Sequence, residues 1–283
     1  MTNRISGTIA FIGGGNMAGA IIQGLVNTQS AQKEQITIAV NSEQSQQAWQ
    51  EQGYEHVYVQ PDSELSSADI WVLAVKPQVM HDVVQQYRGQ LRDNTLVISV
   101  AAGINCDSLA QWLGSSQVPY QRLIRAMPNT PSLIGQGVVG IYGAQEVDAQ
   151  DMARAQALFA PCGKVFQLAH ENMIDAITGV SGSGPAYVFL FIESLIEGAQ
   201  ALGFDKQQAT EIAMATVSGA TALAQQSDQD AAQLRKNVTS KGGTTAAALA
   251  VFEEQGFKHI VAQAMQAASK RGSELAKELA KPH

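Results

Sequence analysis

A short apolar stretch runs directly into three glycines and then into a helical pattern, over residues 8–23. Gly13, Gly15 and Ala18 in this stretch fit the pattern G-x-G-x-x-G/A. The first glycine of that pattern allows a tight turn, the second lets the backbone approach a pyrophosphate, and the small third residue packs a helix on a strand. The amides of Asn16 and Met17, at the start of the helix, would then face the phosphates. The pattern predicts a bound dinucleotide and redox chemistry.

A plain glycine turn would also explain the glycines alone, but the flanking segments favour the dinucleotide pattern, which needs a strand before it and a helix after it. Strand-like and helix-like segments alternate along the first half of the chain. We expect strands at 8–12, 36–40, 70–75, 95–100, 121–126, 137–142 and 164–168. We expect helices at 16–26, 43–52, 78–87, 107–113 and 148–159. Near-continuous apolar strands with helices between them indicate a parallel sheet covered on both faces.

After about residue 168 the strand pattern stops, and long Ala-rich helical segments follow. They are expected at 172–202, 206–226, 244–254 and 257–281. The predicted fold class is therefore α/β: a Rossmann-type dinucleotide-binding domain at residues 1–165, followed by an all-α dimerisation and substrate domain at 166–283.

The composition suits an enzyme with much buried surface. Charged residues make up 15% of the 283 residues, against a usual value of about 25%. The net charge of −7 argues against nucleic acid or an anionic membrane as the main partner. Cys106 and Cys162 form no C-x-x-C pattern and are expected to be reduced thiols, and the five histidines suggest no metal site. Glycines and Asn16 interrupt the N-terminal apolar stretch, and no apolar run approaches membrane-spanning length, so we expect a cytoplasmic protein.

The end of the second expected strand bears on the type of cofactor. NAD-preferring sites place an acid there, which binds the ribose 2′-hydroxyl and repels a 2′-phosphate. Here the strand ends in Asn41 and Ser42, and the first acid, Glu43, comes later. Neutral polar groups could donate to a phosphate, although Ser42 could also simply cap the following helix. We therefore expect NADPH, with NADH as an alternative.

Further loops follow other expected strands, where ligands of open α/β sheets bind. Ala74, Val75, Lys76 and Pro77 follow one strand, and Ala101 and Ala102 follow the next. We expect both loops to contact the cofactor, although Pro77 also suits the first turn of a helix. Residues 125–131 form a third loop, which is either an ordinary turn or part of the site.

The segment N-V-T-S-K-G-G-T-T, residues 237–245, is the most specific stretch of the chain. Two glycines and several hydroxyls precede a helix, so backbone amides and hydroxyl donors gather at its positive end. This arrangement can bind a carboxylate without an arginine. A capped helix start would explain Ser240 or Thr244 alone, but not the whole cluster. We expect a ligand role for at least Ser240 and Thr245.

Several motifs together resemble the pyrroline-5-carboxylate reductase family. They are I-G-G-G-N-M-A, A-V-K-P-Q, A-A-G-I, R-A-M-P-N-T-P, T-G-V-S-G-S-G-P-A-Y and V-T-S-K-G-G-T-T, in this order, spanning nearly the whole chain. The resemblance implies hydride transfer from NAD(P)H to C5 of 1-pyrroline-5-carboxylate, giving L-proline. It also implies a homodimer with interlocking helical halves and an active site near the interface, and it allows a larger assembly, a decamer of dimers.

The resemblance also assigns residues. Ser240, Gly243 and Thr244 would hold the substrate carboxylate, and Thr245 would hydrogen-bond the ring nitrogen as the catalytic residue. Asp228 would lie near the substrate, and Asn237 and Glu171 near the cofactor or site. Lys241 stands where the family commonly has Pro, and Asn41 and Ser42 lack the basic neighbour of some members.

The chemistry agrees with imine reduction, because a carbonyl would need a dedicated acid/base and none is evident. A protonated cyclic imine accepts hydride readily, so the protein mainly has to position two rings, which can supply about 7–11 kcal/mol. Two alternatives remain open. A hydroxyacid dehydrogenase of the same two-domain build would want a lysine on the helix at 172–202, which has none. A dinucleotide-binding redox sensor or scaffold would not need the cluster at 237–245.

Overall fold

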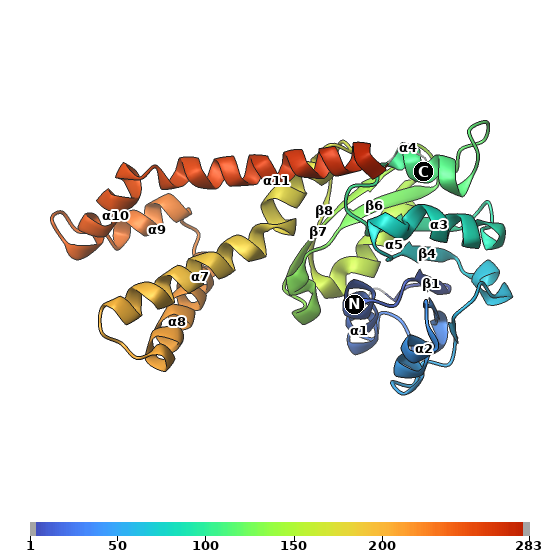
Figure 1. Cartoon of the computed structure of the whole chain (residues 1–283), viewed down its shortest axis with the longest axis horizontal. Coiled ribbons are helices and arrows are strands. Elements are labelled where there is room, and N and C mark those ends of the chain that lie inside the picture. The colour runs from blue at the N-terminus through green and yellow to red at the C-terminus, as the bar shows by residue number, and fades with distance from the viewer. Residues whose placement is uncertain (1–3, 280–283) are drawn as a thin grey trace. The chain divides into compact units, whose positions relative to one another are not determined.

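The computed structural model describes residues 4–279 of the chain (Figure 1). Within them, one eight-stranded sheet has the strand order β3-β2-β1-β4-β5-β6-β7-β8. The strands are β1 Ile9–Ile12, β2 Ile36–Ala39, β3 Val57–Tyr58, β4 Ile70–Leu73, β5 Leu96–Ser99, β6 Leu123–Met127, β7 Gly137–Gly143 and β8 Gly163–Gln167. From β1 the next strands, β2 and β3, are added on one side of the sheet, whereas β4 and the strands after it are added on the other side. The strand order thus reverses between β1 and β4, as in dinucleotide-binding sheets.

The sheet is parallel except at one pairing, since β6 and β7 run antiparallel, with Arg125 opposite Tyr142. This corrects the expected all-parallel sheet. The physical reason is the short link from Met127 to Gly137, because a parallel crossover needs a dozen or more residues. The short strand β3 was not predicted either.

Helices cover both faces of the sheet, as expected. They are α1 Asn16–Asn27, α2 Glu43–Gln50, α3 Pro77–Tyr87, α4 Cys106–Leu113 and α5 Ala149–Phe159. One core lies between the sheet and α1, α2 and α5, and includes Phe11, Trp49 and Phe159. The other lies under α3 and α4, and includes Trp71 and Leu109. Burying each large apolar side chain contributes about 1.5–3 kcal/mol, so these two cores fix the sheet that carries the loops.

The rest of the described chain is helical. It contains α6 Met173–Ile177, a π-helical turn at Thr178–Gly182, α7 Gly184–Ala201, α8 Lys206–Gln226, α9 Ala231–Asn237, α10 Thr244–Glu254 and α11 Phe257–Leu279. The helix expected at 172–202 is therefore interrupted, and the polar helix α9 lies outside the helical ranges expected from the apolar pattern. The α/β fold class with a helical second half is confirmed.

The described residues form two compact units, 4–183 with 266–279, and 184–265. The expected division at 165/166 falls inside β8, whereas the two compact units divide after Ser183 and before Gln266. The reason is that α6 and the end of α11 pack within the first unit. Ile174 is 2% exposed there, Ser273 donates to Asp175 at 2.8 Å, and the α-carbon hydrogens of Gly103 face Leu275.

The second unit exposes an unusual amount of apolar surface. Its helices α7 and α8 pack side by side (Figure 1), yet α7 has no buried residue. Large apolar side chains stay exposed, among them Phe189, Leu190, Ile212, Met214 and Leu223. By length and composition alone, Met173–Ala201 could cross a membrane. This corrects the expectation that no apolar run approaches that length. A helix whose apolar face packs against another subunit can be as apolar as a membrane-spanning helix.

Candidate functional site

The glycine turn after β1 lies at the point where the strand order reverses. The amide of Gly13 donates to the carbonyl of Ala39 at 2.8 Å, and Gly13 has a φ of +107°. A β-carbon at this position would lie 2.8 Å from the carbonyl carbon of Ala74, on the neighbouring strand end. Only glycine therefore fits, because both the backbone conformation and the space exclude a side chain.

The start of α1 offers its amides to an anion. Gly15 precedes the helix and supplies no side-chain cap, and a β-carbon on it would meet nothing within 4 Å. Gly15 and Asn16 are exposed, Met17 is half-buried, and Ala18 is fully buried against the sheet. This is the cradle that a pyrophosphate needs: open space above a glycine at a helix N-terminus. The residues present fit a dinucleotide.

Two more predicted loops lie at the same edge, because β4 and β5 are neighbours in the sheet. Ala74 and Val75 are half-buried, and Lys76 and Pro77 are the N-cap and first residue of α3, so Pro77 has its structural role. After β5, Ala101 is 8% exposed and Ala102 half-buried. The structure thus brings together the predicted cofactor residues from three successive strand ends.

The end of β2 holds Asn41 and Ser42. Asn41 is exposed. The hydroxyl of Ser42 accepts from the amide of Ser45 at 3.3 Å and donates to the hydroxyl of Ser45 at 3.0 Å, so it caps α2. The alternative that Ser42 caps the helix is therefore confirmed by an observed contact. A contact with a 2′-phosphate stays a prediction.

The glycine turn is also held by a side chain that the sequence did not point to. The indole nitrogen of Trp49, on α2, donates to the carbonyl of Gly14 at 3.2 Å. Trp49, Gly15 and Asn16 line a cavity of about 370 Å³ between α1 and α2. The sequence feature that could have indicated this role is a single tryptophan in a helix of mostly polar residues.

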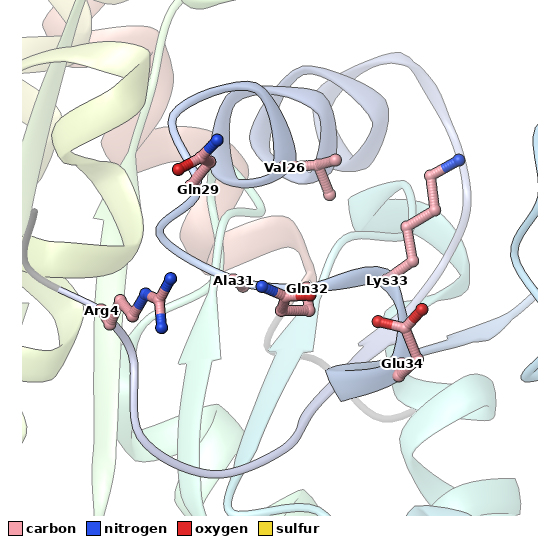
Figure 2. A pocket seen from close by; sticks show the side chains of 7 residues that line it. All are labelled: Arg4, Val26, Gln29, Ala31, Gln32, Lys33 and Glu34. Atoms are coloured by element: carbon pink, nitrogen blue, oxygen red, sulfur yellow. The ribbon is translucent and has the colours of Figure 1, made fainter.

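A second cavity, of about 460 Å³, lies at the opposite edge of the sheet (Figure 2). It is lined by Arg4 on the loop before β1, and by Lys33 and Glu34 on the turn before β2. These residues precede the strands, whereas ligands of such sheets bind beyond the carboxyl ends. This cavity therefore plays no part in the dinucleotide site.

The predicted substrate loop lies in the second compact unit, at the start of α10. Gly242 has a φ of +71°, and the amide of Gly243 donates to the carbonyl of Ser240 at 3.1 Å, closing the turn. Gly243 is the N-cap of α10 and supplies no side-chain cap. A β-carbon on it would overlap the hydroxyl of Ser240, which therefore stands beside the helix N-terminus.

Thr244 and Thr245 are the first two residues of α10; Thr244 is exposed and Thr245 half-buried. The structure thus places Ser240, Gly243, Thr244 and Thr245 around one helix N-terminus, with Lys241 exposed beside them. Amides and hydroxyls at the positive end of a helix can hold a carboxylate.

Two other predicted residues flank this loop in the same unit. Asn237, the last residue of α9, donates to Gln229 at 2.7 Å and accepts from Gln233 at 2.9 Å. Asp228 is exposed in the turn between α8 and α9. The amide of Asn237 is thus held by two glutamines within its own unit.

Two residues that the sequence singled out separately, Arg125 and Glu171, form an ion pair that the sequence did not predict. Arg125 on β6 is 3% exposed and donates to Glu171 at 2.8 Å, while the same carboxylate oxygen accepts from the amide of Cys106 at 2.6 Å. In the same predicted loop, the side-chain amide of Asn129 donates to the carbonyl of Ser181 at 2.9 Å. Residues 125–131 therefore tie β6 to later segments of their unit.

Neither cysteine is poised as a nucleophile. Burial raises the pKa of the Cys106 thiol, and burial raises the pKa of the Cys162 thiol to about 11. Both are therefore protonated near neutral pH. Among residues 4–279, no group of three His, Cys, Asp or Glu side chains could hold a metal ion.

Comparisons with known proteins cover both halves of the chain. A family profile described as pyrroline-5-carboxylate reductase dimerisation matches residues 171–275, and one described as NADP oxidoreductase, coenzyme F420-dependent, matches residues 8–103. The pyrroline-5-carboxylate reductase of Pseudomonas aeruginosa is 40% identical over 272 residues, which are 96% of this chain and 97% of that protein.

Solved structures are similar over the same length. The pyrroline-5-carboxylate reductase of Coxiella burnetii has 35% identity and a TM-score of 0.86, covering 96% of this chain and 99% of that one. The Plasmodium falciparum pyrroline carboxylate reductase, solved with NADP bound, has 29% identity and a TM-score of 0.82, with the same coverage. The chain belongs to the pyrroline-5-carboxylate reductase family.

Proposed function

We propose that this protein is an NAD(P)H-dependent pyrroline-5-carboxylate reductase, which reduces the C=N bond of 1-pyrroline-5-carboxylate to give L-proline. The observation that carries the proposal is the 40% identity to a reductase of that name over 96% of the chain. The two helix N-termini described above agree with it, because the cofactor brings phosphates and the substrate brings a carboxylate.

The cofactor is held by unit 4–183 with 266–279. The amides of Asn16 and Met17 bind the pyrophosphate, and Gly13 and Gly15 leave room for it. Residues Ala74–Pro77, Ala101 and Ala102 line its other half. Asn237, a residue of unit 184–265, is assigned to the cofactor by the family resemblance alone. NAD(P)H, when bound, supplies the hydride.

The substrate is held by the loop before α10. The amides of Gly243 and Thr244 and the hydroxyl of Ser240 bind the carboxylate, Asp228 lies near the ring, and the Thr245 hydroxyl orients the ring nitrogen. That nitrogen is protonated from water, so no strong acid is required of the protein. Catalysis then consists mainly of holding two rings together and excluding water.

We propose NADPH as the preferred cofactor. Neutral Asn41 and Ser42 end β2 in place of an acid that would repel a 2′-phosphate. The Plasmodium falciparum relative was solved with NADP. NADH remains the alternative, because Ser42 already caps α2 and no basic side chain lies on that helix.

We propose a homodimer that works in the cytoplasm, with a decamer of dimers as a larger assembly. The exposed apolar faces of α7 and α8 need a cover, and the matching profile at 171–275 is one of dimerisation. Two protonated, buried thiols suit a reducing compartment.

One assay separates this function from its alternatives. NADPH oxidation is followed with 1-pyrroline-5-carboxylate and without substrate, and NADP⁺ reduction is followed with a hydroxyacid. We expect turnover only with the imine. Turnover of the hydroxyacid would support the dehydrogenase instead, and NADPH binding without any turnover would support a sensor or scaffold.

A further inference from the structure

The ion pair between Arg125 and Glu171 holds the start of α4. Glu171 Oε1 lies 2.8 Å from Arg125 Nη1 and 2.6 Å from the amide nitrogen of Cys106, over separations of 46 and 65 residues along the chain. Cys106 is the first residue of α4, and the loop 100–105 joins it to β5. Glu171 therefore clamps the end of this loop to β6.

The loop 100–105 lies on the nicotinamide side of the site. In sheets of this order, the residue that contacts the adenosine ribose follows β2, and the pyrophosphate lies over the turn after β1. The other half of the dinucleotide must then extend over β4 and β5, on the far side of the reversal point. The loop that carries Ala101 and Ala102 follows β5.

Among the described residues, Glu171 is the only hydrogen-bond partner of the buried Arg125 guanidinium. The Nε and Nη2 atoms of Arg125 are buried without another hydrogen-bond partner among the described residues. Leaving a buried charge without its partner strongly destabilises the folded protein. The ion pair with Arg125 therefore keeps the Glu171 carboxylate in place. The carboxylate is also favourable at the N-terminus of α4, where the helix dipole is positive.

We propose that Glu171 is a positioning residue for the reaction. Through the amide of Cys106 and the side chain of Arg125, it fixes the loop 100–105 against which the nicotinamide half of the cofactor is oriented. The role in turnover rests on the proposed function, whereas the rigidity of the loop does not.

The first test is Glu171→Ala. We expect the amides of residues 101–108 to exchange with deuterium at least about tenfold faster, because their anchor is lost. With NADPH and 1-pyrroline-5-carboxylate, kcat should fall on the order of 10- to 100-fold, since small misplacements of reacting groups are costly. The Kd of NADPH should change much less than kcat, because the contacts at Gly13–Met17 remain.

The matched control is Asp151→Asn, which damages another buried ion pair of the same unit. Arg122, just before β6, donates to both oxygens of Asp151 at 2.8 and 2.7 Å, and Asp151 is 1% exposed. It belongs to α5, on the other face of the sheet from α4. We expect lower thermal stability but unchanged kcat and unchanged exchange at 101–108.

A double variant, Arg125→Met with Glu171→Met, separates positioning from stability. Replacing both partners of a buried ion pair by apolar residues often preserves stability, but it still removes the carboxylate from the Cys106 amide. Fast exchange at 101–108 and low kcat in this folded variant would support the proposal. Wild-type exchange and kcat would overturn it. If the wild-type protein does not reduce the imine, the proposed function fails, and exchange in these variants still decides the positioning claim.

Discussion

Thr245 is the side chain on which the proposed chemistry depends most directly. It is the second residue of α10, beside the amides of Gly243 and Thr244, and it is half-buried. A hydroxyl there can reach a group beside a carboxylate held by the helix N-terminus. A hydrogen bond made at the reacting centre acts on turnover more than on binding.

Thr245→Val keeps the shape of the side chain and removes its hydroxyl. We expect kcat/KM to fall by the equivalent of about 1–3 kcal/mol, the cost of leaving a buried polar group unpaired. NADPH affinity should stay near the wild-type value. Steady-state kinetics and a fluorescence titration measure the two quantities, and Thr245→Ser should restore most of the rate. Unchanged turnover in the folded valine variant would remove Thr245 from the mechanism.

Ser42 tests the preference for NADPH. In Ser42→Asp, the carboxylate can still accept from the Ser45 amide, so α2 keeps its cap. The new charge repels a 2′-phosphate but can accept from a ribose hydroxyl. We expect the KM for NADPH to rise strongly and the KM for NADH to change little. An equal response to both cofactors would leave Ser42 as a helix cap alone.

Sequence reasoning singled out segments whose pattern is local. Gly13, Gly15 and the loop at 237–245 could be recognised because a glycine turn and a helix start fall within a few residues; a ligand contact at either place stays a prediction. Arg125, Glu171 and Trp49 contact partners 35 to 65 residues away. Nothing in their neighbours along the chain specifies those partners, so only the folded sheet brings them into view.

The glycine turn between β1 and α1 lies against the end of β4, and two glycines in it have separable roles. A β-carbon on Gly13 would collide with the end of β4, whereas one on Gly15 would enter open space. The first glycine is therefore required by the fold, whereas the open space beside the second is available to the proposed pyrophosphate.

Gly13→Ala and Gly15→Ala make a matched pair. We expect Gly13→Ala to lower the free energy of unfolding by about 1–3 kcal/mol, through the backbone strain at positive φ and the contact with Ala74. Gly15→Ala should unfold at the wild-type temperature but bind NADPH weakly. Thermal unfolding and NADPH titration check both. Normal NADPH binding by Gly15→Ala would place the phosphates elsewhere.

The alternation of apolar strands and amphipathic helices sufficed to predict the five helices around the sheet and seven of its strands. The direction of β7 was not predicted, because the residues of a strand do not show whether it runs parallel to its neighbour. The short link from Met127 to Gly137 is the feature of the sequence that fixes this direction. Helix α9 lies outside the ranges predicted from the apolar pattern, because its seven residues, Ala231–Asn237, are too few and too polar to show a periodic apolar face.

The helical unit raises a different question, because it exposes many large apolar side chains and buries only Ala209 and Ala213 among its described residues. Gly219 and Ala220 on α8 are exposed, and a β-carbon on Gly219 would meet nothing within 4 Å. Phe189 and Phe191 on α7 are exposed as well. Apolar faces of this kind mark an interface, and small residues let helices approach closely. The dimerisation profile that matches residues 171–275 indicates oligomerisation, and we propose a second copy of the chain as the cover.

Ala220→Glu places a charge on that face without disturbing the described packing of the chain. We expect it to split the dimer and to abolish imine reduction together, because a buried unpaired charge opposes association and the active site is proposed to lie near the interface. Gln226→Glu, at the polar end of the same helix, adds the same charge and should leave both properties intact. Light scattering beside the assay compares them. A fully active monomer would refute the interfacial site. Association of the wild-type protein with detergent or lipid instead of itself would give the apolar segment Met173–Ala201 a membrane role.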